Sequence, residues 1–458
     1  MNSQINLRFE IDKTTARLLL IVAALVVILL ITTTRAGAQE AAETIRVNTR
    51  VVFMDALVKD KRTGVPIADL KPENFEILDD GNARPISYFT REGQARKPLA
   101  LVLILDLRDS GAGRYLKRPE VLKVVAEELA KLSPQDEVAI LAMDLNGENE
   151  KRLWLSGFTR DPAQLVAALA RASDFIEVSP EEADARAAKT SPQGDPDRGS
   201  SVTLGSSAKD PKNEPAHDSS GPGARTPESE KPVSVEVIKG KNGSVITRTT
   251  REDGSVDVKR VNKKGDVTME INDIYDLAAA VKDTTRKAKE ERPNSQLAIV
   301  WVSDGIAPIF FEDRDATEQL LIRSNVIFNS MTAEMRTLFK FLMPIGKPLA
   351  GMMGISIYGA AKRLAQQTGG EAVKVSRTKD FAAGLSKIIG NLTARYSLGF
   401  ALAESEKDDG RLHDLEVRVK APDAKGKMRK LEVSARKGYY MSETGEKETK
   451  ETTAARAQ

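Results

Sequence analysis

The chain has 458 residues, of which 41% are apolar and 29% charged, and its formal net charge is +3. This length suffices for two or three domains with at least one sizeable core, and so small a net charge argues neither for nor against nucleic-acid binding. The chain has no cysteine and only two histidines, His217 and His413. Disulfides, cysteine-bound metals and a thiol nucleophile are therefore excluded, and a Ser-His-Asp triad is disfavoured.

Residues 1–38 are interpreted as a signal peptide. Scattered charges precede an unbroken apolar run at 18–31, which suits the core of a signal peptide and is short for a membrane-spanning helix. The Ala36-x-Ala38 pattern fits cleavage after Ala38. The alternative is an uncleaved membrane anchor. Both interpretations predict an exported protein, periplasmic or secreted to the extracellular space.

Residues 44–92 are predicted to form a small β module. Apolar and polar residues alternate from 44 to 60, as in a strand with one buried face. The run DDGN at 79–82 predicts a hairpin between two short strands. So few strands need a further layer to cover their apolar face.

Two separated stretches, 97–175 and 271–395, are predicted to form one α/β domain. Their strands are continuous apolar runs, which indicates burial by helices on both faces. The alternation of strands and helices predicts a doubly wound, mostly parallel sheet of the Rossmann-like type. The expected strands are 99–106, 136–144, 297–304, 324–331 and 371–375, with an edge strand at 151–159, and the expected helices are 119–132, 161–172, 274–291, 316–323, 354–370 and 381–392.

A long insertion, 176–270, interrupts this α/β pattern. Its first part, to about 231, lacks aromatic residues and is rich in polar residues, Pro and Gly, so we expect a disordered segment. Its second part holds four short alternating segments separated by Gly-containing turns, which predicts a β-meander forming a projecting hairpin arm.

The C-terminal region consists of a predicted β segment at 396–441 and a polar tail at 442–458. Within the β segment, His413 is interpreted as a partly exposed strand residue and not as a metal ligand. The two flanking β regions, 44–92 and 396–441, are predicted to pair with each other, because the ends of a domain often lie close together.

Acidic residues follow two of the predicted central strands. Asp106 ends the first and Asp304 follows the third, with Ser110 and Ser303 close to them in sequence. In a doubly wound sheet the ligand crevice lies at the carboxyl ends of the strands. Two carboxylates and neighbouring hydroxyls at that edge suit a hard cation such as Mg²⁺.

These features resemble the von Willebrand factor A (VWA) fold and its metal-ion-dependent adhesion site. The resemblance rests on a hydrophobic strand ending in Asp, a following serine, a later strand ending in Ser-Asp-Gly, and the order of elements. The flanks, with LKPENFEILDDGNARPISYF before the domain and LTARYSLGF and ARKGYY after it, are similar to the VWFA-related family described from acidobacterial genomes. The resemblance covers most of the chain that follows the signal peptide.

The resemblance also implies a residue-by-residue match to the family's metal site, which has the pattern Asp-x-Ser-x-Ser, a separate Thr and a later Asp. Asp106 matches the first aspartate, Ser110 the last serine and Asp304 the later aspartate. Arg108 stands in place of the first serine, and Asn272 in place of the threonine. The site is therefore expected to be degenerate.

Arg108 is the main departure from the family's pattern. Its guanidinium would oppose a divalent ion and could itself neutralise Asp106 or Asp304. Asp109 could compensate by pairing with Arg108 or by entering the site. Two alternatives stay open, namely bound Mg²⁺ or Mn²⁺ and a metal-free pocket neutralised by arginine, and the metal-free pocket is favoured.

The function predicted from the sequence is non-enzymatic protein–protein interaction or adhesion outside the cytoplasm, through the face that carries Asp106 and Asp304. In the family's metal-dependent binders a partner carboxylate completes the coordination of the ion, and here Arg108 or Asp109 could contact the partner directly. The alternative is a structural or assembly protein that binds through its β flanks and insertion. A metal-dependent hydrolase is the remote third hypothesis. No nucleic acid is expected as a partner, and a membrane only if the N-terminal segment stays as an anchor.

Overall fold

The computed structural model describes residues 50–91, 97–107, 113–143, 152–174, 233–251, 254–333, 348, 350–375, 378–423 and 425–441. The predicted signal peptide, the first part of the insertion to about 231 and the polar tail lie outside these residues. Among the described residues, no helix is long and apolar enough to cross a membrane.

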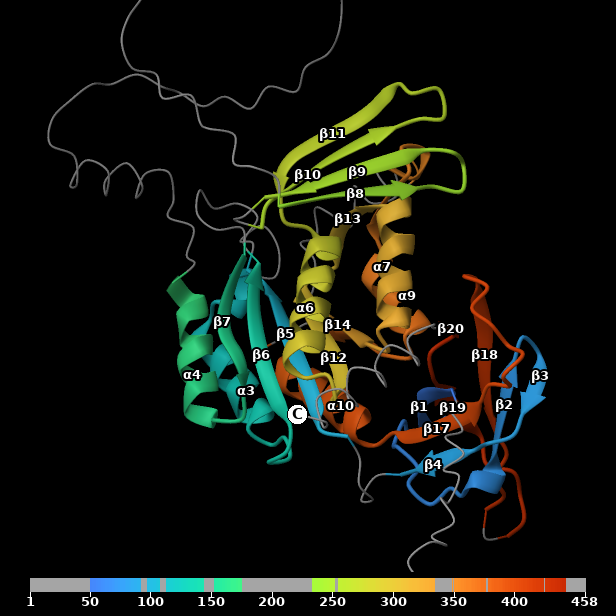
Figure 1. Cartoon of the computed structure of the whole chain (residues 1–458). Helices are drawn as coiled ribbons and strands as arrows, with labels where there is room; N and C mark the ends of the chain where they lie inside the picture. The colour runs from blue at the N-terminus through green and yellow to red at the C-terminus, as the bar shows by residue number, and fades with distance from the viewer. Residues whose placement is uncertain are drawn as a thin grey trace, which may run out of the picture. The chain divides into compact units, whose positions relative to one another are not determined.

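The centre of the structure is a six-stranded sheet in the order β16-β14-β12-β5-β6-β7 (Figure 1). Five strands are parallel, and β7 pairs antiparallel with β6 at one edge. Every residue of β5 is buried, as its continuous apolar sequence predicts. The strands are β5 Leu99–Asp106, β6 Glu137–Met143, β7 Arg152–Thr159, β12 Gln296–Ser303, β14 Ile327–Ala333 and β16 Ala372–Val375.

Helices cover both faces of this sheet. Alternate residues of β5 belong to different cores: Leu101 and Leu103 pack with one group of helices, and Val102 and Ile104 with the other. The first group is α3 Pro119–Leu129, α4 Pro162–Ala170 and α10 Thr378–Thr393; the second is α6 Leu277–Glu291, α7 Phe311–Arg323 and α9 Ala360–Gln367. The predicted doubly wound, mostly parallel α/β fold is confirmed.

The strand order has a direct consequence for function. The chain forms β5, β6 and β7 toward one edge and then returns to form β12, β14 and β16 toward the other. The winding direction therefore reverses between β5 and β12. In doubly wound sheets the ligand crevice opens at the carboxyl ends of the strands at this reversal point.

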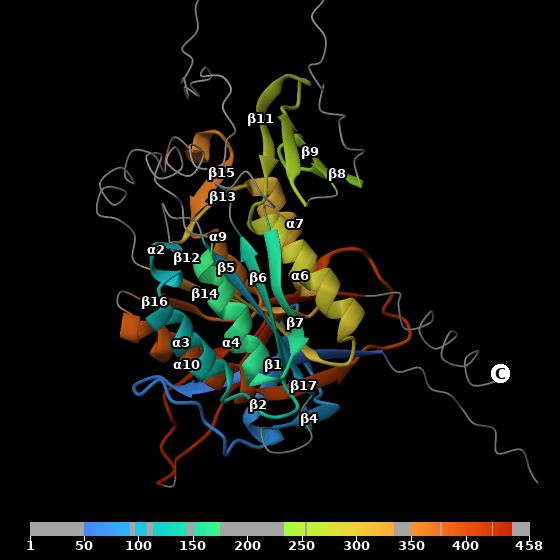
Figure 2. The same cartoon turned by 90° about the vertical axis from the view of Figure 1, so that its left-hand side faces the viewer.

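The second part of the insertion is a four-stranded antiparallel meander, as predicted. Its strands are β8 Ser234–Lys239, β9 Val245–Thr250, β10 Val256–Val261 and β11 Val267–Ile274. It is not a free arm, however, because Ile246, Val256 and Val258 are buried in the same core as Tyr275 and the α6 helix. Figure 2 shows this sheet beside the ends of α6 and α7. We call it the insertion sheet.

The two flanking regions pair with each other, as predicted. β1 Val51–Asp60 lies between β17 Tyr396–Ala401 and β19 Leu431–Ser434, and β4 Tyr88–Thr90 completes that sheet. The second flanking sheet has the order β20-β18-β2-β3, with bounds β2 Phe75–Asp79, β3 Asn82–Arg84, β18 Leu412–Val419 and β20 Gly438–Tyr440. The two sheets share one apolar core, so each covers the face that the other exposes.

One predicted helix is wrong in its first half. Residues 355–358 form strand β15 (Ile355–Tyr358), which pairs with β13 (Ile306–Phe310), and the helix α9 begins only at Ala360. The sequence did not indicate this pair because its two strands are short, are about fifty residues apart, and one contains Pro308, which cannot donate a backbone hydrogen bond. The remaining short elements are the 3₁₀ turns η1 Pro72–Asn74 and η2 Arg171–Asp174 and the helix α2 Gly113–Leu116.

Candidate functional site

The two aspartates singled out in the sequence meet at the predicted crevice. Asp106 is the last residue of β5 and Asp304 directly follows β12, and the two strands are parallel neighbours with Leu105 opposite Val302. Asp106 is 1% exposed and Asp304 is 5% exposed. The sheet therefore holds two carboxylates close together and largely out of water. We call this edge of the sheet the strand-end site.

Ser303 connects the two carboxylates. Its hydroxyl oxygen lies 2.9 Å from Asp106 Oδ2 and 3.3 Å from Asp304 Oδ1. A serine hydroxyl has one proton, so it can donate to one carboxylate at a time and leaves its own oxygen as an acceptor. The sequence placed Ser303 near the site but did not indicate this bridging position, which depends on the register of β5 against β12.

The turn after β12 fixes the orientation of Asp304. The Ile306 amide donates to Asp304 Oδ1 at 2.9 Å, and the Gly305 amide donates to the Ser303 hydroxyl at 3.2 Å. Gly305 has φ +83°, and a Cβ there would lie 2.7 Å from Cγ2 of Thr332. Glycine is therefore required at this position both by conformation and by space.

The other predicted site residues are placed as follows. Arg108, Asp109 and Ser110 lie outside the described residues, so their part in the site stays a prediction. Asn272 is an exposed residue of β11, at a register shift between β10 and β11. Its predicted place in the site likewise stays a prediction.

Among the described residues, the atoms of the strand-end site that could bind a metal ion are all oxygens. Asp106 and Asp304 offer carboxylates and Ser303 offers a hydroxyl oxygen, which is the donor chemistry that Mg²⁺ and Mn²⁺ prefer. These three residues therefore fit a hard divalent cation, which would supply a positive charge between two buried carboxylates. The same geometry fits a guanidinium, which also neutralises carboxylates through hydrogen bonds.

No protein-family model matches the chain, and no curated protein matches it. Solved structures that are similar to it include the VWA domain of SpRpn10 (8% identity, TM-score 0.29, 63% of this chain and 93% of that one). Another is the von Willebrand factor type A protein from Catenulispora acidiphila (8%, TM-score 0.32, 81% and 74%). A third is the pilus adhesin SpaC from Lactobacillus rhamnosus GG in its open conformation (8%, TM-score 0.31, 80% and 47%).

Two of these three are named as VWA domains. That is the kind of domain that the sequence resembles. At identities of 8% and these TM-scores, the assignment of the fold rests on the strand order and on the helices that cover each face of the central sheet. Because one fold supports many functions, the function of the chain depends on the residues of its site.

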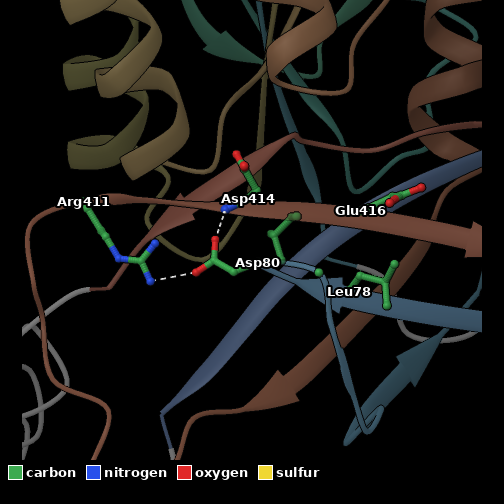
Figure 3. Close-up of a pocket in the computed structure, with 7 residues that line it drawn as sticks. Leu78, Asp80, Arg411, Asp414 and Glu416 are labelled. Carbon is green, nitrogen blue, oxygen red and sulfur yellow. Dashed lines mark hydrogen bonds and ion pairs between the residues drawn. The ribbon is translucent and has the colours of Figure 1, made fainter.

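A second polar cluster lies in the flanking sheets, beside a shallow pocket (Figure 3). Asp80 accepts from the Asp414 amide at 2.9 Å and from Arg411 at 2.7 Å, and its Oδ2 lies 3.0 Å from Nδ1 of His413. The other ring nitrogen of His413 lies 3.2 Å from Asp409. The prediction that His413 is partly exposed is therefore wrong, since it is buried and stacks on a tyrosine ring.

This cluster also contains a group of possible metal ligands. One ligand atom each of Asp79, Asp80 and His413 lies within 4.8 Å of the others. Arg84 bonds Asp79, and Arg411 bonds Asp80, so both carboxylates already face cations of the protein. The hydrogen bonds and ion pairs thus join the 79–82 turn to the 409–414 segment, and we interpret the cluster as structural.

Proposed function

We propose that the chain is an exported, non-enzymatic binding protein whose strand-end site contacts a protein partner. The observation that carries this proposal is the pair Asp106 and Asp304, joined through Ser303 at the point where the sheet reverses its winding. Two buried carboxylates at a ligand crevice attract a cation, whether it is a metal ion or a basic side chain.

The chemistry of the site supports binding over catalysis. Ser303 lies against carboxylates, and the described histidine, His413, belongs to β18 in the flanking sheets. In the part of the chain that the structure describes, the strand-end site thus has no serine–histidine pair of the kind that activates a nucleophile.

Two modes of contact are compatible with this proposal. With Mg²⁺ or Mn²⁺ held by Asp106, Asp304 and Ser303, a partner carboxylate could complete the coordination. Without a metal, Arg108 could pair with the partner's carboxylate directly, as the sequence favours. Both modes predict a partner with an exposed acidic residue.

Thermal melting in excess EDTA and then with millimolar Mg²⁺ or Mn²⁺ separates the two modes. A ligand that binds only the native state at about 100 times its dissociation constant adds about 2.7 kcal/mol of stability. A rise in Tm that Asp304→Asn abolishes would show that the metal mode operates. No rise in the wild type, together with a rise in Arg108→Ser, would show that arginine closes the site.

Binding itself is tested by affinity capture of envelope proteins from the source cells. Loss of the same captured protein in Asp106→Asn and Arg108→Ala, with cooperative melting intact, would support the strand-end site as the contact surface. Capture that survives both substitutions would contradict the proposal.

A specific observation favours the second candidate function, assembly through the insertion sheet. β8 is an edge strand, and Val233, Val235 and Val237 are 63%, 58% and 57% exposed. An exposed apolar edge strand can pair with a strand of another molecule. A Val235→Lys, Val237→Lys double variant should abolish capture under this candidate and leave it unchanged under the first.

A further inference from the structure

A groove of about 530 Å³ lies between the insertion sheet and α7. Ile238 and Lys239, at the end of β8, line one side of it, and residues of α7 from Phe311 to Ile322 line the other. β8 is the edge strand of the insertion sheet (Figure 1). The groove therefore adjoins a free sheet edge, and its volume is in the range of ordinary ligand sites.

The backbone groups of β8 alternate between β9 and the free edge. The Gly240 amide donates to the Ser244 carbonyl, so the even-numbered residues of β8 direct their hydrogen bonds toward β9. The amide and carbonyl groups of the odd-numbered residues, Val235, Val237 and Lys239, therefore point to the free edge. An extended peptide can add to such an edge as a further strand, held by main-chain hydrogen bonds.

Apolar side chains are available on both faces of the strand that would be added. Successive side chains of β8 point to opposite faces of the sheet. Ile238 packs against the core of the α/β domain, and the Phe311 ring across the groove is 36% exposed although the Arg314 guanidinium lies 5.0 Å from its centroid. Val235 and Val237 are exposed on the outer face. An apolar residue opposite Ile238 would thus enter the groove, and β-branched residues would cover the valines.

The unpaired charge of the groove is positive. Each acidic residue of its lining forms an ion pair with an arginine, the pairs being Glu312–Arg260, Asp315–Arg314 and Glu318–Arg363. Lys239 and Lys241 also line the groove and are exposed, and neither forms an ion pair within the described residues. The charge of the groove therefore favours an anionic ligand. A second copy of β8 fits less well, because it would bring its own two lysines to this edge.

We propose that an extended acidic segment of a protein partner pairs antiparallel with β8, with carboxylates on Lys239 and Lys241 and an apolar side chain in the groove beside Phe311. This inference rests on the second candidate function, assembly through the insertion sheet. It adds to that candidate the chemistry of the partner and the groove that receives it.

The probe is the peptide acetyl-ETEIVTV-amide, whose two glutamates lie opposite Lys239 and Lys241 when its isoleucine lies opposite Ile238. N-methylation of the valine opposite Val237 removes an amide that would bond to β8, whereas N-methylation of the isoleucine removes one that would point away. Calorimetry with the full chain is expected to show that the first methylation abolishes binding and the second does not. No binding of the parent peptide, or equal effects of the two methylations, would overturn the proposal.

Reversal of charge tests the contact with lysine. Lys239→Glu is expected to weaken binding about fivefold, which corresponds to about 1 kcal/mol, and the peptide acetyl-KTKIVTV-amide should bind this variant better than the wild type. Lys264→Glu is the matched control, because Lys264 is an exposed lysine of the same sheet, in the turn between β10 and β11, and does not line the groove. Equal losses in both variants would contradict the contact with Lys239.

Sedimentation of the full chain tests the other occupant. A dimer that Val237→Lys dissociates would show that a second copy occupies β8 and would overturn the proposal. Asp304→Asn should leave the affinity for the peptide unchanged, because Asp304 belongs to the strand-end site. Loss of captured protein in the Val235→Lys, Val237→Lys variant, without binding of the peptide to the wild type, would support assembly through β8 and refute only the acidic segment.

Discussion

The Ser303 hydroxyl lies 2.9 Å from Asp106 Oδ2, so a side chain of β12 is hydrogen-bonded to the end of β5. This contact joins the two central strands where the winding of the sheet reverses. Because both groups are nearly inaccessible to water, losing the donor would leave a buried carboxylate oxygen with one hydrogen bond fewer. The strand-end site is therefore part of the stability of the sheet as well as a place for a ligand.

We expect Ser303→Ala to lower the free energy of unfolding by about 1–3 kcal/mol, the usual cost of depriving a buried acceptor of its donor. The matched control is Ser156→Ala in β7, because the buried Ser156 hydroxyl has no hydrogen-bond partner in the described part of the chain. That variant should stay within about 0.5 kcal/mol of the wild type. Urea denaturation measures both, and equal losses in the two variants would contradict the role given to Ser303.

A buried arginine links the insertion sheet to the α/β domain, in addition to the shared apolar core and to the ion pair between Arg260 and Glu312. Arg248 of β9 donates to Asp276 at 2.8 Å and to Asp313 at 2.9 Å, and its side chain is 6% exposed. Asp276 also caps the amino end of α6 by accepting from the Ala279 amide. The three side chains thus connect β9, the start of α6 and the start of α7.

Arg248→Met is expected to cost about 3–5 kcal/mol, because it leaves two carboxylates buried without their cation. Hydrogen exchange should show faster exchange across 233–274 than across the central strands. Arg251→Met, on the same sheet, replaces a more exposed arginine paired with Asp257 and should cost about 1 kcal/mol or less. Unchanged exchange of the insertion sheet in Arg248→Met would show that the apolar core and the Arg260–Glu312 ion pair suffice to dock it.

The same contact predicts a dependence of stability on pH. Burial, with the nearby Asp276 charge, raises the pKa of Asp313 to about 7 against the opposing effect of Arg248. A folded-state pKa above the unfolded value near 3.9 means that the contribution of Asp313 to stability is complete below about pH 4 and is lost as pH rises toward 7. Asp313→Asn should remove this loss, so the difference in Tm between variant and wild type should grow from pH 4 to 7. Parallel curves would contradict the raised pKa.

The sequence predicted those parts of the fold that depend on periodicity. Residues 99–106 and 297–304 were recognisable as buried strands because helices on both faces require continuous apolar runs. The position of Asp106 and Asp304 at one edge followed from that assignment. The Ser303 bridge did not, because it depends on the register of two strands about two hundred residues apart in sequence.

Two inward-facing polar residues have partners that the sequence could not predict. His413 shares the buried face of β18 with Leu415 and Val417, an alternation visible in the sequence, but its partners Asp80 and Asp409 could not be read from it. Arg248 likewise shares the buried face of β9 with Ile246. A charge on a buried face can be satisfied only by partners from other elements, and the sequence does not name those partners.

Gly370, in the junction between α9 and β16, lies so close to the backbone of β14 that there is no room for a methyl group. A Cβ at Gly370 would lie 2.0 Å from the Phe328 carbonyl oxygen, a backbone atom of the neighbouring strand β14 that cannot move aside without disturbing the sheet. Gly370→Ala should therefore destabilise the fold by about 3 kcal/mol, the upper end of the usual cost of overpacking.

Gly390→Ala is the control within α10, where a Cβ meets nothing within 4 Å. It should stabilise the helix by about 0.5–1 kcal/mol, because alanine loses less conformational freedom than glycine on folding. Opposite signs in urea denaturation would confirm the close packing of Gly370 on β14, and a neutral Gly370→Ala would show that this junction can relax.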